Sequence, residues 1–492
     1  MNLSRRSLLI SAAAAPWVYA ASAAPPAPFG ACPSSRQLAW HKREFYAFLH
    51  FTVNTFTNKE WGYGDEDPSV FNPTDFDADA IVEPLRDAGM KGVILTCKHH
   101  DGFCLWPTAT TDHSVRSSRW RNGKGDVVRD ISQAARRHGL DFGVYLSPWD
   151  RNNAAYGAPA YVPLYRRQLT ELLTNYGPIF EVWHDGANGG DGYYGGARER
   201  RTIDKTTYYG WPTTWDLIRR LQPGAVIFSD VGPDIRWVGN EKGIAGDPCW
   251  ATYDPVGEHG GPAAPGDVRA ADSPTGTRHG SHWLPAECDV SIRPGWFWHE
   301  AEDARVKTPE ALRKLYFESV GRGASFLLNV PPDRRGLLAD PDIASLRQFG
   351  KDTRAMFAHN IAESGRIEAT NVRAHSARFA PEHLLSLAAG YWATGDGVSQ
   401  ADVTLTLPRP ERVGVIRLRE EVAYGQRIDS FSVEAETNGA WSEIARAESL
   451  GACRLFLLDS PVEAARFRLR ILHAAAGPAL REFSLYPPPA VA

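Results

Sequence analysis

The 492-residue sequence is poor in sulfur, with six cysteines and three methionines. The cysteines form no CxxC pair and show no zinc-type spacing. This excludes a small protein built on a disulfide framework and a structural zinc module. We expect buried free thiols, although a Cys97–Cys104 bridge is compatible with the sequence. The six positions are Cys32, Cys97, Cys104, Cys249, Cys288 and Cys453.

The sequence also lacks an excess of charge of one sign. It has 54 Lys and Arg against 58 Asp and Glu, and no run of like charges. A nucleic-acid-binding surface needs clustered basic residues, so we expect no nucleic-acid partner. Hydrophobic residues make up 43% and charged residues 23%, values that exclude a disordered, collagen-like or coiled-coil chain.

An apolar segment stands out only near the N-terminus. Arg5 and Arg6 precede this segment, and small residues around Ala23 fit a cleavage site. The S-R-R-x-L-L pattern resembles a twin-arginine export signal. Pro16 and the short apolar stretch argue against a membrane-spanning anchor, which is the alternative. We predict a cleaved export signal over residues 1–23, no membrane span, and a bacterial protein that is periplasmic or secreted.

Glycine, proline and tryptophan are abundant, with 44, 35 and 16 residues. Many large flat side chains on many loops suit flat, partly polar ligands such as sugar rings. This composition alone identifies no ligand.

Residues 30–362 show the pattern of alternating strands and helices. This alternation predicts βα units and a parallel sheet. The length fits a (β/α)8-like TIM barrel with six clear strands, and we place the other two in the poorly periodic stretch 240–300. A doubly wound sheet is the alternative, but the Gly-rich turn expected after its first strand is missing. The predicted strands are 44–52, 92–98, 141–149, 179–186, 225–230 and 324–330, and the predicted helices are 77–89, 126–139, 161–177, 213–224 and 311–323.

Residues 366–489 have a different pattern, with apolar and polar residues alternating at period two. Turn residues separate the segments, which predicts an antiparallel β-sandwich. The predicted strands are 401–407, 413–420, 429–436, 466–472 and 481–487.

Polar residues gather where the predicted barrel strands end. In a barrel this is the face that carries active sites. The alternative is that polar residues only mark the start of loops, but histidine, tryptophan and acids are not typical loop residues. The residues are His50, His99, His100, Asp101, Trp149, Asp150, Asp185 and Asp230.

Asp185, followed by Gly186, is a candidate nucleophile or base, and a turn cap is its structural alternative. Acid–base work needs a second carboxyl, and spacing does not choose among the candidates. The neighbours His99 and His100 would hold a metal only with further ligands, and no HExxH pattern is present. Without a metal they would hydrogen-bond hydroxyls, so we expect no metal and no cofactor. The candidates for the second carboxyl are Asp230, Asp234, Glu241, Glu287 and Asp289.

Seven motifs occur in order over residues 40–360, and together they resemble the α-L-fucosidases of glycoside hydrolase family twenty-nine. The resemblance is greater to the branch that acts on α-1,3/1,4-linked fucose than to the branch with broad activity. The motifs are FLHFTVNTFTNKEWG, LTCKHHDGFCLWPT, FGVYLSPW, EVWHDGAN, SDVGPDIRWVGNE, WLPAECDVSIRPGWFWH and GASFLLNVPPDRRG.

The resemblance implies a retaining exo-hydrolase that removes terminal α-L-fucose from fucosylated glycans through a covalent fucosyl-enzyme, without a metal. The resemblance implies that Asp185 is the nucleophile and that Glu241 is the acid/base. Glu287 is the alternative acid, because the acid segment of the broad-activity branch aligns there. His184 stands where similar proteins often have Phe, and we expect this to change packing rather than chemistry. The residues that match positions around the fucose are His50, Glu60, Trp61, His99, His100, Tyr145, Glu287 and Trp296.

The C-terminal segment resembles a discoidin-like (coagulation factor 5/8 type C) domain, through YWATGDG, VGVIRLRE, FSVEAETNGAWSEIA, ARFRLRIL and REFSLYP. Such domains often bind carbohydrate, and a structural module is the equal alternative. Two other functions stay open: a non-catalytic exported carbohydrate-binding protein, and a metal-dependent hydrolase that uses His99 and His100. The sequence does not indicate the oligomeric state.

Overall fold

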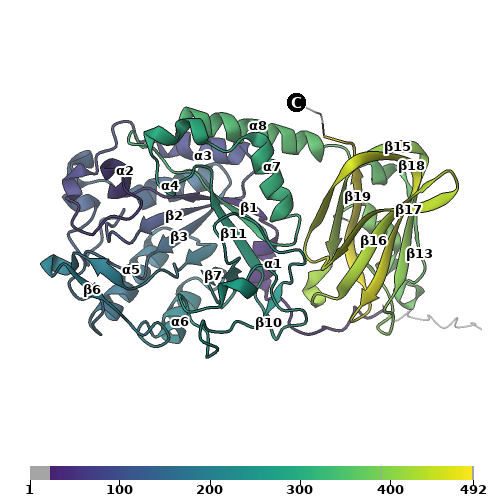
Figure 1. Ribbon diagram of the computed structural model, residues 1–492, viewed down its shortest axis with the longest axis horizontal. Helices are drawn as coiled ribbons and strands as arrows, with labels where there is room; N and C mark the ends of the chain where they lie inside the picture. Colours follow the sequence, from purple (N-terminus) through teal and green to yellow (C-terminus); the bar gives the residue numbers. More distant parts are fainter. Residues whose placement is uncertain (1–22, 389, 490–492) are drawn as a thin grey trace, which may run out of the picture.

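The computed structural model describes residues 23–388 and 390–489, in two parts that lie side by side (Figure 1). The predicted export signal, except for its last residue, lies outside the described residues. Within the described ranges, no helix combines the length and the apolar character that a bilayer span requires.

The N-terminal part is a closed barrel of eight parallel strands, which confirms the predicted parallel barrel. All six strands that the sequence made clear are present. Around the barrel the order is β1-β12-β11-β8-β7-β4-β3-β2. The strands are β1 (Phe45–Leu49), β2 (Gly92–Lys98), β3 (Asp141–Leu146), β4 (Glu181–Trp183), β7 (Val226–Ser229), β8 (Ile235–Trp237), β11 (Ala286–Ser291) and β12 (Ser325–Asn329).

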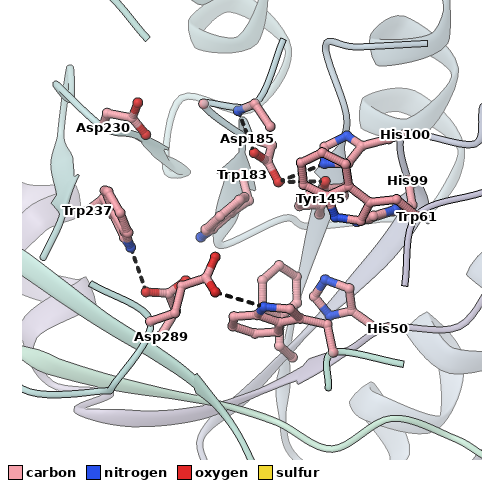
Figure 2. Close-up of a pocket in the computed structure, with 15 residues that line it drawn as sticks. His50, Trp61, His99, His100, Tyr145, Trp183, Asp185, Asp230, Trp237 and Asp289 are labelled. Atoms are coloured by element: carbon pink, nitrogen blue, oxygen red, sulfur yellow. Dashed lines mark hydrogen bonds and ion pairs between the residues drawn. The ribbon is translucent and has the colours of Figure 1, made fainter. Parts of the chain in front are cut away.

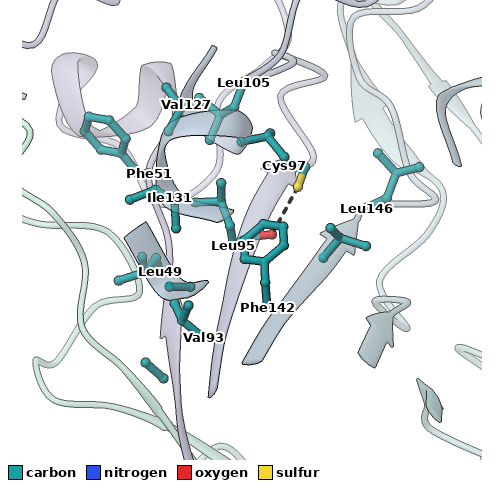
Figure 3. Packing of buried hydrophobic residues seen from close by; sticks show 14 of the residues in the cluster. Leu49, Phe51, Val93, Leu95, Cys97, Leu105, Val127, Ile131, Phe142 and Leu146 are labelled. Carbon is teal, nitrogen blue, oxygen red and sulfur yellow. Dashed lines mark hydrogen bonds between the residues drawn. The ribbon is translucent and has the colours of Figure 1, made fainter. Parts of the chain in front are cut away.

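Helices cover the outside of the barrel, because each presents an apolar face to the strands. Figure 3 shows this packing where Val127 and Ile131 of α4 lie over Val93 and Leu95 of β2. The carboxylate of Asp126 caps α4 by accepting the Arg129 N–H. The helices are α1 (Ser35–His41), α2 (Val53–Thr57), α3 (Ala78–Asp87), α4 (Val127–Arg137), α5 (Tyr161–Asn175), α6 (Trp211–Leu221), α7 (Pro309–Glu318) and α8 (Asp340–Met356).

The two strands that the sequence left hidden are β8 and β11, and only β11 lies within 240–300. The prediction was wrong for β8, which begins at Ile235, directly after β7. A short turn without a helix joins the two, and Phe228 pairs with Ile235. With neither a helical period nor a long apolar run, this segment has no strand signal in the sequence. Two small antiparallel two-stranded sheets lie in the loops: β5 (Gly190–Gly192) with β6 (Glu199–Arg201), and β9 (Thr252–Tyr253) with β10 (His282–Trp283).

The C-terminal part is a separate antiparallel sheet with its own apolar core. The predicted strands 401–407 and 413–420 form one strand, β15, with a register shift between Thr406 and Glu411. Pro408 and Pro410 lie in this shift, because proline cannot donate to a regular ladder. The strands are β13 (Arg366–Ala369), β14 (Trp392–Ala393), β15 (Ala401–Glu420), β16 (Ile428–Thr437), β17 (Ala440–Glu448), β18 (Arg454–Ala474) and β19 (Ala479–Tyr486).

Asp429 of β16 joins the two parts through a buried carboxylate. It accepts hydrogen bonds from His279 Nε2 at 2.9 Å and from His473 Nδ1 at 2.8 Å, and it pairs with Arg278 at 2.7 Å. Arg278 and His279 come from the loop between β9 and β10 of the barrel part. Burial by itself would raise the pKa of Asp429, but these hydrogen bonds hold the pKa below its usual value.

We expect Asp429→Asn to lower the free energy of unfolding by about 2 kcal/mol at pH 7, because charge-assisted hydrogen bonds are lost. A carboxyl whose pKa is depressed by folding stabilises above its unfolded pKa and loses this effect as the pH falls through the folded value. The difference between variant and wild type should therefore have its full size at pH 7 and be smaller at pH 2, because it is lost only below the unfolded pKa of about 4. Denaturant unfolding at both pH values measures it. Asp459→Asn, at an exposed acid of β18, is the control, and an equal loss in both variants would contradict the prediction.

Candidate active site

The carboxyl ends of the barrel strands surround one cavity of about 210 Å³ (Figure 2). Alternate residues of an extended segment face the same side, which is why Phe48 of β1 and His50, directly after β1, both reach the cavity. Its volume is below the about 300 to 1,000 Å³ of pockets for drug-sized ligands, so it suits one small ring. The lining residues are Phe48, His50, Trp61, His99, His100, Tyr145, Trp183, Asp185, Gly186, Ala187, Asp230, Trp237, Glu241, Asp289 and Trp296.

Asp185 follows β4 and turns its carboxylate into the cavity (Figure 2). Oδ2 accepts the Tyr145 hydroxyl at 2.8 Å, and Oδ1 accepts the Ala187 N–H at 2.7 Å. Burial raises the pKa of Asp185, while these two hydrogen bonds oppose the rise. Both bonds fix the orientation of a carboxylate, as a nucleophile or base requires.

Three histidines form a neutral, polar wall of the cavity. Burial lowers the pKa of His50 and of His100 to about 3, and lowers the pKa of His99 as well. His50 Nδ1 contacts Asn329 Oδ1 at 2.9 Å, and His100 Nδ1 contacts Ser147 Oγ at 2.7 Å. A neutral imidazole that binds through one nitrogen keeps the other for a ligand hydroxyl.

His99 and His100 belong to no recognisable metal centre. Among the described residues, no group of three or more His, Cys, Asp or Glu side chains has an arrangement that could hold a metal ion. His100 Nε2 lies 3.7 Å from Asp185 Oδ2, so the ring faces a carboxylate of the cavity.

Glu241 lies in the loop after β8 and lines the cavity. Its Oε2 accepts the Trp296 indole N–H at 3.2 Å. Burial raises the pKa of Glu241, the Trp296 hydrogen bond lowers it, and the charges of Asp185 and Glu60 raise it. A carboxyl with a raised pKa at the mouth of a cavity can carry a proton at neutral pH and donate it.

Two further carboxyls line the cavity. Burial raises the pKa of Asp230 to about 6, and Asp230 Oδ2 accepts the Gly266 N–H at 2.7 Å. Burial raises the pKa of Asp289 well above its usual value, and Asp289 Oδ1 accepts the Trp237 indole N–H at 2.8 Å. The Asp230 carboxylate also occupies the space where Gly186 would carry a Cβ, so that glycine accommodates a neighbouring side chain.

Glu287 is not in the cavity, which contradicts its sequence-based placement as a substrate-binding residue and alternative acid. Glu287 is completely buried and precedes Asp289 by two residues on β11, so both side chains lie on the same face of the strand. Its Oε1 accepts the Trp183 indole N–H at 2.7 Å, and its Oε2 accepts the Tyr46 hydroxyl. A carboxyl enclosed in this way within the barrel core has no path to a ligand.

Glu60 also differs from its prediction, because its carboxylate does not line the cavity. Oε2 accepts the Trp296 N–H at 2.8 Å, and Oε1 accepts the Phe297 N–H at 3.2 Å. Glu60 thus holds the backbone of a loop behind the cavity wall.

The other site residues predicted from the sequence meet at the cavity: Asp185, Glu241, His50, Trp61, His99, His100, Tyr145 and Trp296. Sequence reasoning missed Phe48, which lies two positions before His50 on its strand, so strand alternation could have found it. Trp183 likewise lies two positions before Asp185 and forms part of the cavity floor. His184 faces the other way, as expected, and its Nδ1 contacts the Tyr165 hydroxyl of α5 at 2.9 Å.

Asp234, the remaining candidate acid, lies outside the barrel interior. It forms ion pairs with Arg219 at 2.5 Å and with Arg36 at 3.4 Å, and accepts the Ile227 N–H at 2.7 Å. These contacts give it a structural role. All six cysteines are free thiols, and five of them are buried, so Cys97 and Cys104 are not bridged.

Comparison with known proteins agrees with this geometry. The family model described as alpha-L-fucosidase matches residues 29–355. Alpha-L-fucosidase 1 of Arabidopsis thaliana is 42% identical over 466 residues, which are 94% of this chain and 88% of the plant protein. The crystal structure of a glycoside hydrolase family twenty-nine member from an unknown rumen bacterium is 40% identical, with a TM-score of 0.83, and covers 94% of this chain and 79% of that one.

A family twenty-nine fucosidase of Ruminococcus gnavus, crystallised in complex with fucose, is 31% identical, with a TM-score of 0.83. The match covers 95% of this chain and 97% of that one. The family model, the full-length relatives and the barrel with its cavity all agree: this chain belongs to the alpha-L-fucosidase family, glycoside hydrolase family twenty-nine, and is a glycoside hydrolase of that kind.

Proposed function

We propose that this protein is a retaining exo-glycosidase that releases terminal α-L-fucose from fucosylated glycans. The observation that carries the proposal is the pair of carboxyls, Asp185 and Glu241, on the walls of one cavity of sugar-ring size. The fucose complex of the Ruminococcus gnavus relative supports fucose as the bound sugar.

In the first step, Asp185 attacks the anomeric carbon and the bond to the leaving oxygen breaks. Glu241 gives its proton to that oxygen, so the leaving sugar departs as a neutral alcohol. In the second step, Glu241 takes a proton from water, and the water oxygen displaces Asp185 from the same carbon. Two inversions retain the configuration, and this chemistry requires carboxyls about 5 to 5.5 Å apart.

The remaining cavity residues would bind the sugar. His50, His99 and His100 offer ring nitrogens to its hydroxyls, and their neutral state avoids repulsion of the positive charge that develops on the ring. Trp61 and Trp296 would pack on the apolar face of the ring and on its C6 methyl group.

We further propose that the enzyme prefers α-1,3- and α-1,4-linked fucose, with support from the ordered motifs of the sequence. A Lewis-type trisaccharide should be cleaved with a kcat/KM at least about tenfold higher than that of 2′-fucosyllactose, because its branched aglycone makes additional contacts in the transition state. A tenfold ratio corresponds to about 1.4 kcal/mol of additional transition-state binding. The assay compares both with an aryl α-L-fucoside. Equal or better cleavage of 2′-fucosyllactose would overturn the linkage assignment.

Three further assignments stay proposals. Residues 30–362 would be the catalytic domain, and residues 366–489 a discoidin-like β-sandwich that binds carbohydrate. The support for the second domain is its long antiparallel strands around a separate apolar core. Residues 1–23 would be a twin-arginine-like export signal, with support from Arg5 and Arg6.

A further inference from the structure

Glu60 makes contacts that a sugar-binding residue would not need. Its two carboxylate oxygens accept the backbone N–H groups of Trp296 and Phe297, at 2.8 and 3.2 Å. His299 Nε2 donates to Glu60 Oε1 at 2.6 Å, and His299 Nδ1 lies 2.8 Å from Asn58 Oδ1. A loop between β11 and η6 (Glu300–Arg305) is thus tied to the loop after α2.

The tied loop is fitted closely around the Glu60 carboxylate. A Cβ added to Gly295 would lie 2.5 Å from Glu60 Oε1. Only glycine lets the backbone approach the carboxylate this closely. Asn329 holds the other side of the loop, because its Nδ2 donates to the Trp296 carbonyl at 2.8 Å.

The residue held in this way touches the proposed acid/base. With its backbone N–H on Glu60 and its carbonyl on Asn329, Trp296 has little freedom to move. Its indole N–H donates to Glu241 Oε2 at 3.2 Å. Glu241 has no other hydrogen bond from a described side chain, and it lies in an exposed loop. Its orientation therefore depends on the position of this indole.

We infer that Glu60 and His299 are positioning residues for the fucosidase reaction: together they fix the loop that carries Trp296, and the Trp296 indole aims the Glu241 carboxyl at the leaving oxygen. This inference rests on the proposed role of Glu241. It assigns Glu60 a task at the aglycone side of the cavity in place of contact with fucose.

The consequence is a loss that depends on the leaving group. Proton donation matters most when the aglycone is a poor leaving group, as in a natural glycan, and matters little for an activated aryl fucoside. A small misplacement of a catalytic group costs about 10- to 100-fold in rate. A loop that only supported the fold would instead affect both substrates equally.

The test uses Glu60→Ala, which removes both backbone anchors, and His299→Phe, which keeps the ring but removes its hydrogen bonds. Looser packing of Trp296 on fucose would slow both substrates, whereas poorer proton donation would slow only the trisaccharide, so in each variant we expect kcat/KM for the trisaccharide to fall about 10-fold or more beyond the fall for an activated aryl fucoside. Glu300→Gln, which removes a neighbouring charge whose side chain has no hydrogen bond or ion pair with any described residue, should behave as wild type. His299→Phe keeps the test decisive if Glu60→Ala does not fold.

Trp296→Phe gives a second readout, since it keeps an aromatic ring and removes only the indole N–H. This hydrogen bond stabilises the charged form of Glu241, so its loss should raise the pKa of Glu241 and move the basic limb of the kcat/KM profile to higher pH. Asp185, Glu60 and Asp289 are the other charged groups that act on Glu241, and none is changed.

Glu241→Ala, measured in parallel, tests the acid/base assignment separately from the positioning role of Glu60 and His299. If it shows neither leaving-group dependence nor rescue by azide, the acid/base assignment fails and the positioning inference falls with it. If Glu241→Ala shows both, but Glu60→Ala and His299→Phe slow both substrates equally, only the positioning inference is overturned.

Discussion

Replacement of Asp185 by Asn should abolish turnover of every α-L-fucoside, with kcat lowered by about 10⁴-fold or more. An amide cannot attack the anomeric carbon, so no fucosyl-enzyme forms. The fold should persist, because Asn can still accept the Ala187 N–H through its carbonyl oxygen, as Asp185 Oδ1 does. The loss is measured as kcat on an aryl fucoside, and fucose binding is measured by calorimetry.

Asp216→Asn, on the exposed side of α6, is the matched control and should retain full activity. An Asp185→Asn protein that turns over at the wild-type rate would overturn the nucleophile assignment. An Asp185→Asn protein that no longer binds fucose, with its thermal unfolding unchanged, would show that Asp185 acts in binding rather than in chemistry.

Replacement of Glu241 by Ala should lower kcat/KM by about 10²- to 10⁴-fold on the Lewis-type trisaccharide, and far less on an activated aryl fucoside. With the aryl substrate the first step needs no acid, and the second step becomes slow because the base is missing. Added azide needs no base, so it should restore kcat and yield α-fucosyl azide, because azide displaces Asp185 in the second of two inversions. The product is identified by nuclear magnetic resonance.

Glu287→Ala provides the contrast. It would leave the Trp183 indole N–H without its acceptor, remove a partner of the Tyr46 hydroxyl and open a cavity in the barrel interior, so we expect a loss of stability of about 3 kcal/mol. Azide should not rescue it. If azide rescued Glu287→Ala and not Glu241→Ala, the acid/base assignment would belong to Glu287 despite its burial.

The barrel was predictable because its strands and its helices have different patterns of apolar residues in the sequence. Buried parallel strands are continuous apolar runs, and the covering helices repeat at 3.6 residues. β8 could not be predicted, since its three residues follow a helix-free turn. β15 was divided in two, because Pro408 and Pro410 give a turn signal that the sheet accommodates as a register shift.

Candidate carboxyls could be recognised from the sequence, but their selection needed the structure. Glu287 and Asp289 lie on one face of β11, so strand alternation does not distinguish them. The height of each residue along the barrel axis decides which one meets the cavity, and this height is set by the pairing of β11 with β8 and β12.

The sequence by itself determined the parallel barrel, the second domain, the family and the chemical nature of the cavity, because strand ends and ordered motifs are local features. Only the tertiary structure decided that Glu241 faces the cavity, that Glu287 lies beneath it, and that Glu60 holds Trp296 across 236 positions of sequence. These outcomes depend on contacts between distant segments. Such contacts follow from how the closed barrel brings its loops together, and no local pattern of residues records them.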